Sequence, residues 1–219
     1  AGSENIDCRL RKADFSLDGK KVVPWLGMPI ADIPALDRVL VVGSFLRKDH
    51  PLLAQRLRQA AKKLTRVSLL HVADDDQLIS LHAKSIVAPS ALAAELAGVV
   101  KAAAEARGAA VDAALAGVQP SAAAKAIAES LASGEKGAIF LGNFAQQHAQ
   151  AATLHALAQK LAELTGARFG YLGEAANAVG CYLPNAVPGA QGLNAARLLA
   201  APRPADFVLH AEPELDCAN

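Results

Sequence analysis

The chain has 219 residues, of which 53% are apolar but only 4% aromatic, and alanine (50) and leucine (30) are the commonest types. This aliphatic content is enough for a buried core and excludes a largely disordered chain. Lys and Arg number 22 against 21 Asp and Glu, so the basic excess of a nucleic-acid-binding protein is absent. No apolar run approaches the roughly 20 residues that span a bilayer, because Pro89 and Glu95 interrupt the richest region, 85–100. We therefore expect no direct membrane insertion.

The two ends of the sequence indicate a piece of a larger protein. Residues 1–5 are neither a start methionine nor a signal peptide and resemble a cloning remnant. At the other end, the chain stops at Asn219 without a helix after its last expected strand. We expect the domain to be truncated there.

Three cysteines, Cys8, Cys181 and Cys217, are odd in number and widely separated. This pattern argues against a disulfide framework and is typical of a reducing compartment. It also lacks the short C-x2-C spacings that iron–sulfur clusters and zinc sites require. We expect no metal or cluster on the cysteines of this chain.

Residues 1–37 are expected to form an N-terminal arm, since the segment 22–30 is punctuated by proline and glycine and favours an extended conformation. The aliphatic run 39–42 then predicts a strand buried on both faces, which ends at Gly43–Ser44.

A helix is predicted to begin at Pro51, with His50 as its N-cap, because proline is favoured at the first helical position. A second strand is predicted at 67–72, which completes a β-α-β unit. The apolar stripe of the helix consists of Leu53, Leu57, Ala60, Ala61 and Leu64.

The remaining segments repeat this alternation. Further strands are predicted at 85–88, 137–141 and 205–210, and a long loop at 173–192. Helices are predicted from Ser90 to about Gly108, within 109–132 with Ser121 as a cap, and up to Thr165–Gly166. Asn143 and Gln146 have the spacing of a capping box.

Strands that alternate with helices predict an α/β fold with a doubly wound, mostly parallel sheet and helices on both faces. This domain is expected to cover residues 38–219.

The motifs of several enzyme classes are absent from the sequence. There is no G-x-S-x-G, G-x-G-x2-G or G-x4-G-K-[ST] motif. Ser133–Gly137 is glycine-rich but precedes a strand, which predicts a turn. His148 and His155 are seven residues apart on one predicted helix, about 10 Å, which is too far to share a metal. They are expected to be caps or half-buried polar residues.

Two places remain where a ligand is physically reasonable. Gly43–Ser44 and Gly142–Asn143 each follow a predicted strand and precede a helix. Ligands bind at the carboxyl ends of strands in open parallel sheets, and helix N-termini attract phosphate. The alternative interpretation is that each glycine only permits a tight turn.

These segments resemble the molybdopterin oxidoreductase superfamily. The resemblance begins with Val39–Ser44, His50–Leu53 and the basic helix that follows, and continues with Gly142–His148 and Thr165–Ala167. Within this superfamily, four motifs are similar to the G-subunit family of bacterial NADH-quinone oxidoreductase, respiratory complex I. They are Pro24–Ile33, Gly173–Gly180, Gly189–Asn194 and Glu212–Ala218. Their order and spacing extend over about residues 6–219.

The resemblance implies a part of the C-terminal domain of that peripheral-arm subunit, with the fold of the molybdenum enzymes but without their cofactor. The iron–sulfur clusters of such a subunit lie in its N-terminal part. Cofactor-binding relatives carry Gly-x-Asn-Pro in the first loop, whereas here Ser44, Phe45 and Leu46 follow Gly43. The change removes a polar contact and adds the bulk of Phe45. Cys181 is expected to be a buried structural thiol rather than a molybdenum ligand.

The sequence therefore predicts a structural domain with no catalytic, cofactor-binding or metal-binding residue of its own. Its expected partners are the other peripheral-arm subunits and the rest of its own subunit, on the cytoplasmic side of the bacterial inner membrane. Whether this chain takes part in catalysis is left open. The first alternative is a fragment of an active molybdopterin oxidoreductase of the formate dehydrogenase type, and a weaker one is a free-standing nucleotide-binding enzyme.

Overall fold

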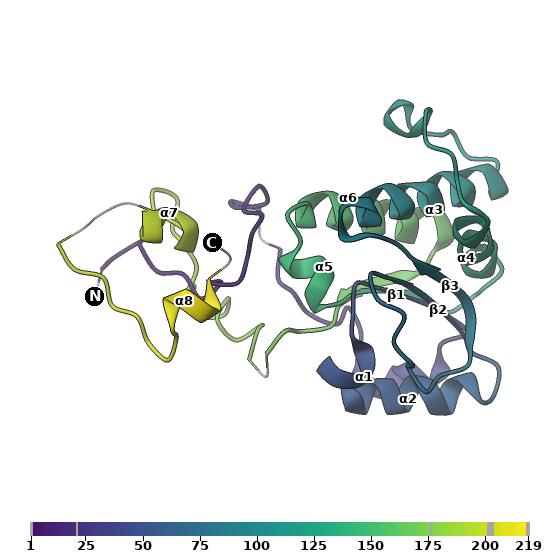
Figure 1. The fold of residues 1–219 in the computed structure, drawn as a ribbon, viewed down its shortest axis with the longest axis horizontal. Coiled ribbons are helices and arrows are strands. Elements are labelled where there is room, and N and C mark those ends of the chain that lie inside the picture. Colours follow the sequence, from purple (N-terminus) through teal and green to yellow (C-terminus); the bar gives the residue numbers. More distant parts are fainter. Residues whose placement is uncertain (1, 21, 176, 201–203, 218–219) are drawn as a thin grey trace.

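A computed structural model describes residues 2–20, 22–175, 177–200 and 204–217 (Figure 1). Its centre is a five-stranded, wholly parallel sheet with the strand order β3-β2-β1-β4-β5. The predicted doubly wound α/β fold is confirmed. The strands are β1 (Arg38–Val42), β2 (Arg66–His71), β3 (Leu81–Ile86), β4 (Gly137–Leu141) and β5 (Arg168–Tyr171).

Helices cover both faces of the sheet (Figure 1). One face packs against η1 (Ile30–Ala35), α1 (Leu46–Asp49) and α2 (Pro51–Ala61). The other packs against α3 (Leu92–Ala106), α4 (Ala122–Ala132), α5 (Asn143–Gln147) and α6 (Ala151–Thr165). Short 3₁₀ turns occur at η2 (Pro89–Ala91) and η3 (Ala113–Leu115). No helix among the described residues is long and apolar enough to cross a membrane.

The central strand β1 shows why a continuous aliphatic run forms this sheet. Val39 and Val41 belong to the apolar cluster on one face, whereas Leu40 and Val42 belong to the cluster on the other. Successive side chains of a strand point to opposite faces, so a strand between two helical layers must be apolar at every position.

Most helix predictions are confirmed. His50 holds the N-cap position before Pro51, Ser121 Oγ accepts a hydrogen bond from Ala124 N at 2.9 Å, and α6 ends at the left-handed Gly166. The expected burial of Leu64 is wrong: α2 ends at Ala61, so Leu64 lies in the following turn and is 88% exposed.

The predicted capping box at Asn143 and Gln146 is also wrong. Gly142 holds the N-cap position and Asn143 is already helical. Gln146 Nε2 instead donates to the carbonyl oxygens of Leu141 (3.3 Å) and Leu172 (2.7 Å), so it joins the ends of β4 and β5.

Two strand predictions need correction. β5 was not expected, because Phe169 and Gly170 do not form an aliphatic run. The predicted strand at 205–210 is wrong: these residues form no strand, lie outside the five-stranded sheet and end at His210, whose φ is +51°. The strand predicted at 85–88 overlaps the observed strand only at Ser85 and Ile86, because β3 extends from Leu81 to Ile86. As an edge strand it alternates between buried or partly buried side chains and exposed ones instead of forming an apolar run.

In the N-terminal arm, residues 22–26 have no regular secondary structure, and Trp25 and Leu26 lie beside β5. Tyr171 N donates to the carbonyl oxygen of Trp25 at 2.8 Å. Gly27, at φ +76°, faces Phe169 and Gly170 so closely that a Cβ atom would lie 2.0 Å from Phe169 O. The absence of a side chain at Gly27 and Gly170 lets the arm lie directly on the edge strand.

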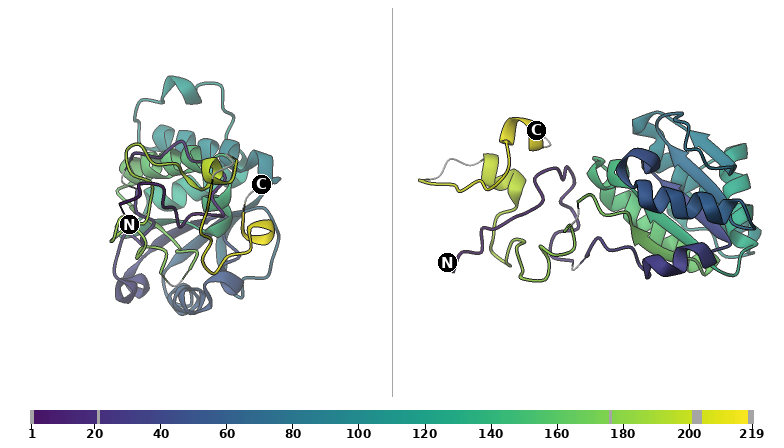
Figure 2. Two further views of the ribbon diagram at one scale, coloured as in Figure 1. Left: turned by 90° about the vertical axis from the view of Figure 1, so that its left-hand side faces the viewer. Right: turned by 90° about the horizontal axis from the view of Figure 1, so that it is seen from below.

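Both ends of the chain lie together beside the α/β domain (Figure 2). We call residues 3–18, 174–175, 177–200 and 204–217 the end lobe; it includes α7 (Ala195–Ala200) and α8 (Pro213–Asp216). Gly189 N donates to Glu4 O at 3.1 Å, and Leu193 N donates to Asn5 Oδ1 at 2.9 Å. Segments almost 190 residues apart in the sequence thus contact each other.

The contact between arm and edge strand predicts the effect of a small substitution. In Gly170→Ala, the new Cβ would lie 1.9 Å from Leu26 O, so the arm must move. We expect a loss of about 3 kcal/mol in the free energy of unfolding, measured with urea. Gly117→Ala is the matched control, because no atom lies within 4 Å of its Cβ. Equal stability of the two variants would contradict the close contact.

Candidate functional site

The carboxyl edge of the sheet contains a topological switch point between β1 and β4. The chain leads from β1 to β2 on one side and from β4 to β5 on the other. Ligands of open α/β sheets bind in the crevice at such a point. The two loops singled out from the sequence, Gly43–Ser44 and Gly142–Asn143, both lie there.

The structure brings these loops into direct contact. Gly142 N donates to Val42 O at 2.8 Å, and Ala145 N donates to Gly43 O at 3.2 Å. Gly43 has φ +60°, and a Cβ there would lie 2.7 Å from Ala145 N. A Cβ on Gly142 would lie 2.2 Å from that of Ser44. A side chain at either glycine would collide with the other loop. The glycines are therefore needed for the contact between the loops and not only for a tight turn.

Buried polar atoms gather around these two loops. Ser44 and His71 are 0% exposed, and neither Ser44 Oγ nor either ring nitrogen of His71 has a hydrogen-bond partner among the described residues. His50 Nε2 and Asn143 Oδ1 are also buried without a partner. A buried polar group without a partner costs about 1–3 kcal/mol, so these atoms oppose folding.

Burial lowers the pKa of His71, and the charges of Asp75 and Asp49 oppose this effect only in part. Burial also lowers the pKa of His50, against the opposing effects of Asp49 and Asn143. Both imidazoles are thus held in the neutral form. Without solvent access or a hydrogen bond to Ser44, His71 does not form a nucleophile–base pair.

Two aromatic side chains lie beside His71. The ring of Phe45 lies edge-on to His71 with centroids 4.4 Å apart, and Phe144 lies 6.4 Å from the same imidazole. Sequence reasoning identified Phe45 as bulk in the first loop but missed His71. Its place as the last residue of β2, at the same edge, is the signal that could have found it.

The other histidines singled out from the sequence have separate structural contacts. His148 Nε2 lies 3.0 Å from Pro89 O, and its Nδ1 accepts a hydrogen bond from Gln150 N. His155 is buried and bonded to the hydroxyl of Tyr171. Burial lowers the pKa of His155 and raises that of Tyr171, so both groups are neutral. No group of three potential metal ligands occurs among the described residues.

A hollow of about 340 Å³ lies between the arm, α6 and β5. Trp25, His155, Gln159 and Tyr171 are among its lining residues. None of its lining residues comes from the loops after β1 or β4, so this hollow is separate from the switch point.

Ser133–Gly137 forms the predicted turn before β4. The amides of Glu135 and Lys136 donate to the carboxylate of Asp37 at 2.8 and 3.1 Å. The anion that this glycine-rich turn binds is thus a side chain of the protein itself.

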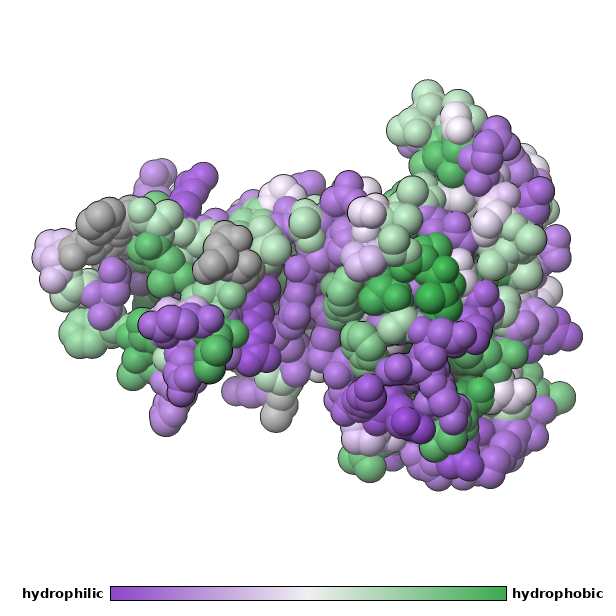
Figure 3. All heavy atoms as spheres, viewed as in Figure 1, coloured by the Kyte–Doolittle hydropathy of each residue, from purple (hydrophilic) through white to green (hydrophobic). Residues whose placement is uncertain are grey.

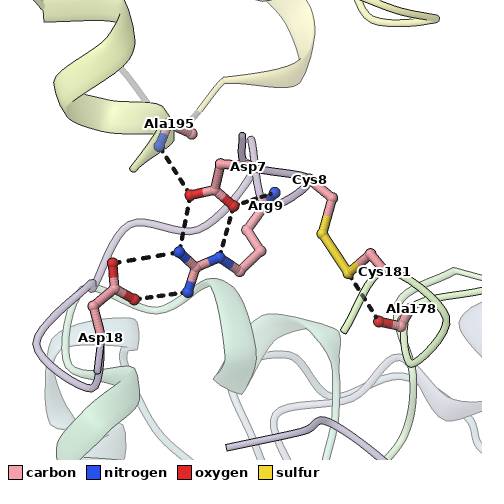
Figure 4. Close-up of a disulfide and its surroundings, with 7 residues drawn as sticks. All are labelled: Asp7, Cys8, Arg9, Asp18, Ala178, Cys181 and Ala195. Atoms are coloured by element: carbon pink, nitrogen blue, oxygen red, sulfur yellow. Dashed lines mark hydrogen bonds and ion pairs between the residues drawn. A yellow bond between two sulfur atoms is a disulfide. The ribbon is translucent and has the colours of Figure 1, made fainter. Parts of the chain in front are cut away.

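The expectation for the cysteines is wrong for one pair. Cys181 is not a buried thiol but forms a disulfide with Cys8, while Cys217 is unpaired (Figure 4). The two residues are 173 positions apart, and only the contact between the ends of the chain brings them together. Spacing in the sequence therefore gives no sign of the pair.

Comparisons with known proteins identify a family. The family model for molybdopterin oxidoreductase matches residues 1–218. Among solved structures, the chain is similar to the formyltransferase/hydrolase complex (FhcABCD) from Methylorubrum extorquens in complex with methylofuran, with 18% identity and a TM-score of 0.45. The match covers 68% of this chain and 39% of that chain, so this sequence spans well under half the length of that neighbour. No curated protein matches the chain.

The buried imidazoles predict how stability depends on pH. Because the pKa of His71 is lowered in the folded state, the unfolded chain binds a proton more readily as the pH falls below about 6.5. Stability is therefore present above this value and is lost as the pH falls further, by at most about 1.4 kcal/mol per pH unit for one group.

We expect His71→Phe to lose less stability than the unaltered chain between pH 7.5 and 5.5, as measured by urea unfolding. Ser44→Ala also removes an unpartnered polar atom from this edge but does not titrate. The Ser44→Ala variant should therefore show the same pH dependence of the free energy of unfolding as the unaltered chain. Identical pH profiles for His71→Phe and the unaltered chain would show that this imidazole is not responsible.

Proposed function

We propose that this chain, which belongs to the molybdopterin oxidoreductase family, is a scaffold domain without catalytic activity. Its parent would be the G subunit of a bacterial NADH-quinone oxidoreductase, which transfers electrons from NADH through iron–sulfur clusters toward quinone. The clusters would be bound by a part of that subunit outside residues 1–219. The domain would contact the rest of its subunit and other peripheral-arm subunits, on the cytoplasmic side of the inner membrane.

The closed carboxyl edge carries this proposal. The loops after β1 and β4 touch each other, and Ser44 and His71 are fully buried between them and Phe45. A pterin dinucleotide would have to separate the loops and displace the ring of Phe45 to reach the switch point. As they are arranged, these residues do not fit that group. A domain with a filled edge can still pack against neighbours, which is what a scaffold requires.

The assignment to a G subunit rests on the four resemblance motifs, and most of their described residues lie outside the sheet. Gly189–Leu193 contacts Glu4 and Asn5, and Asp216 accepts a hydrogen bond from Arg11 at 2.6 Å. Ala176 and Ala218, at single positions of two of these motifs, lie outside the described residues. Apart from Gly173, the described residues of three of the four motifs thus lie in the end lobe, outside the sheet.

One observation favours the alternative of an active formate dehydrogenase-type oxidoreductase. The unpartnered atoms of Ser44, His50, His71 and Asn143 are donors and acceptors of the kind that line a polar ligand site. They would gain partners if the edge opened around a cofactor. The two functions differ in what the full-length protein contains.

We expect the full-length subunit, purified from its native membrane, to contain substoichiometric molybdenum, tungsten and pterin, because the closed edge leaves no room for the cofactor. Elemental analysis and fluorescence of oxidised pterin measure this, with an active formate dehydrogenase analysed alongside as the positive control. Stoichiometric metal and pterin would overturn the scaffold function in favour of the enzyme.

The sequence upstream of residue 6 tests the choice of parent protein separately. Clustered cysteines there would agree with a subunit that binds iron–sulfur clusters. Their absence, together with absence of the pterin, would exclude the G subunit while leaving a non-catalytic domain.

A further inference from the structure

We propose that the Cys8–Cys181 disulfide is a reversible covalent cross-link, and that its reduction converts the end lobe from an ordered to a mobile state. The proposal does not depend on the function proposed above. It rests on how the lobe is held together, on the position of the disulfide within it, and on the access of solvent to Cys8.

The end lobe has almost no apolar core. Ala195 is the one buried residue in its described part. Many of its large apolar side chains are exposed at the surface (Figure 3). They include Leu183, Leu199, Phe207, Leu209 and Leu215. Hydrophobic burial, the main stabilising contribution in folding, therefore contributes little here.

A small polar network replaces that core (Figure 4). Arg9 lies between two carboxylates, at 2.7 Å from Asp7 Oδ1 and 2.7 Å from Asp18 Oδ1. The Asp7 side chain is fully buried, and its Oδ2 accepts a hydrogen bond from Ala195 N at 2.9 Å. This network joins the N-terminal segment to the start of α7.

The remaining contacts between the two ends are exposed to water. Gln191 N donates to Glu4 Oε2, Leu193 N donates to Asn5 Oδ1, and Arg11 pairs with Asp216. The free energy required for local unfolding is small for segments that are held by exposed hydrogen bonds and few apolar contacts. Cross-linking two such segments removes many open conformations, so the disulfide has a large effect on the order of this lobe.

The disulfide is placed where it acts on the whole network. Cys8 lies between Asp7 and Arg9, which form the ion pair. Cys181 lies in the loop that follows β5, and Figure 4 shows the disulfide beside the Asp7–Arg9–Asp18 group. Breaking the S–S bond releases the covalent tie between the N-terminal segment and this loop.

The bond is also chemically accessible, because Cys8 is exposed. A thiolate of a dithiol reductant attacks one sulfur, the S–S bond breaks, and a mixed disulfide forms. The second thiol of the reductant then displaces the protein sulfur. The products are the oxidised reductant and two protein thiols, so two electrons and two protons pass to the protein.

The reduced state has a hydrogen-bond acceptor in place. Cys181 Sγ lies 3.4 Å from the carbonyl oxygen of Ala178, which a thiol can use as an acceptor once the disulfide is reduced. In reducing compartments, disulfides are commonly transient and redox-sensing. A lobe that is ordered only when oxidised presents its exposed apolar side chains as a defined surface only in that state.

The test counts thiols and measures amide hydrogen exchange on the full chain. Purified without reductant and denatured, the protein should show one thiol, from Cys217, and three after treatment with a dithiol. After reduction, amides of residues 4–18 and 178–195 should exchange at least about tenfold faster, while amides of β1 and β4 change little. Three thiols without reductant, or unchanged exchange in the lobe, would overturn the proposal.

Two serine variants separate the disulfide from general effects of the reductant. Cys8→Ser should show fast exchange in the lobe under both conditions. Cys217→Ser, the matched control, should respond to the dithiol as the unaltered chain does. If Cys8→Ser keeps the slow exchange of the oxidised chain, the polar network alone orders the lobe. The proposal that the disulfide orders it would then be wrong.

Discussion

The contact between the loops after β1 and β4 determines much of what this protein can do. Two glycines allow the backbones to meet at the switch point, where open α/β sheets otherwise keep a crevice for ligands. The contact also buries Ser44 and His71, whose polar atoms lose water without gaining partners. This arrangement has an energetic cost that the aliphatic core must offset. In the scaffold function proposed above, the surfaces of the domain and not its carboxyl edge would make the interactions.

Two kinds of stabilisation occur in one chain. The α/β domain is held by apolar side chains on both faces of the sheet, with β1 in contact with both layers. The end lobe is held by Arg9 between two carboxylates, by exposed hydrogen bonds and by one disulfide. Because hydrophobic burial is cooperative over a large core and exposed polar contacts are not, the two parts should respond differently to reductant and to pH.

Local signals in the sequence predicted the α/β domain well. The aliphatic run at 39–42, Pro51 and Ser121 each act through neighbours in the chain, and the structure has the expected strand, helix start and cap at these places. Predictions of segments whose structure depends on residues far away in the sequence were less accurate. β5 is short and contains a glycine because the arm lies on it, and residues 205–210 have strand-like composition but no strand beside them.

The candidate site was predicted only in part. The sequence identified both glycine loops, since a glycine after a buried strand is a local feature. That these loops touch, and that His71 from a different strand lies beside them, follows from the order of the strands in the sheet.

The amino-acid sequence by itself determined the fold class, because alternating apolar strands and amphipathic helices have few ways to bury their apolar faces. The tertiary structure decided that the two loops at the switch point touch and that Cys8 is bonded to Cys181. Both depend on residues about 100 to 170 positions apart, and the distance between such residues is set by how the sheet and the chain ends pack, which no local pattern encodes.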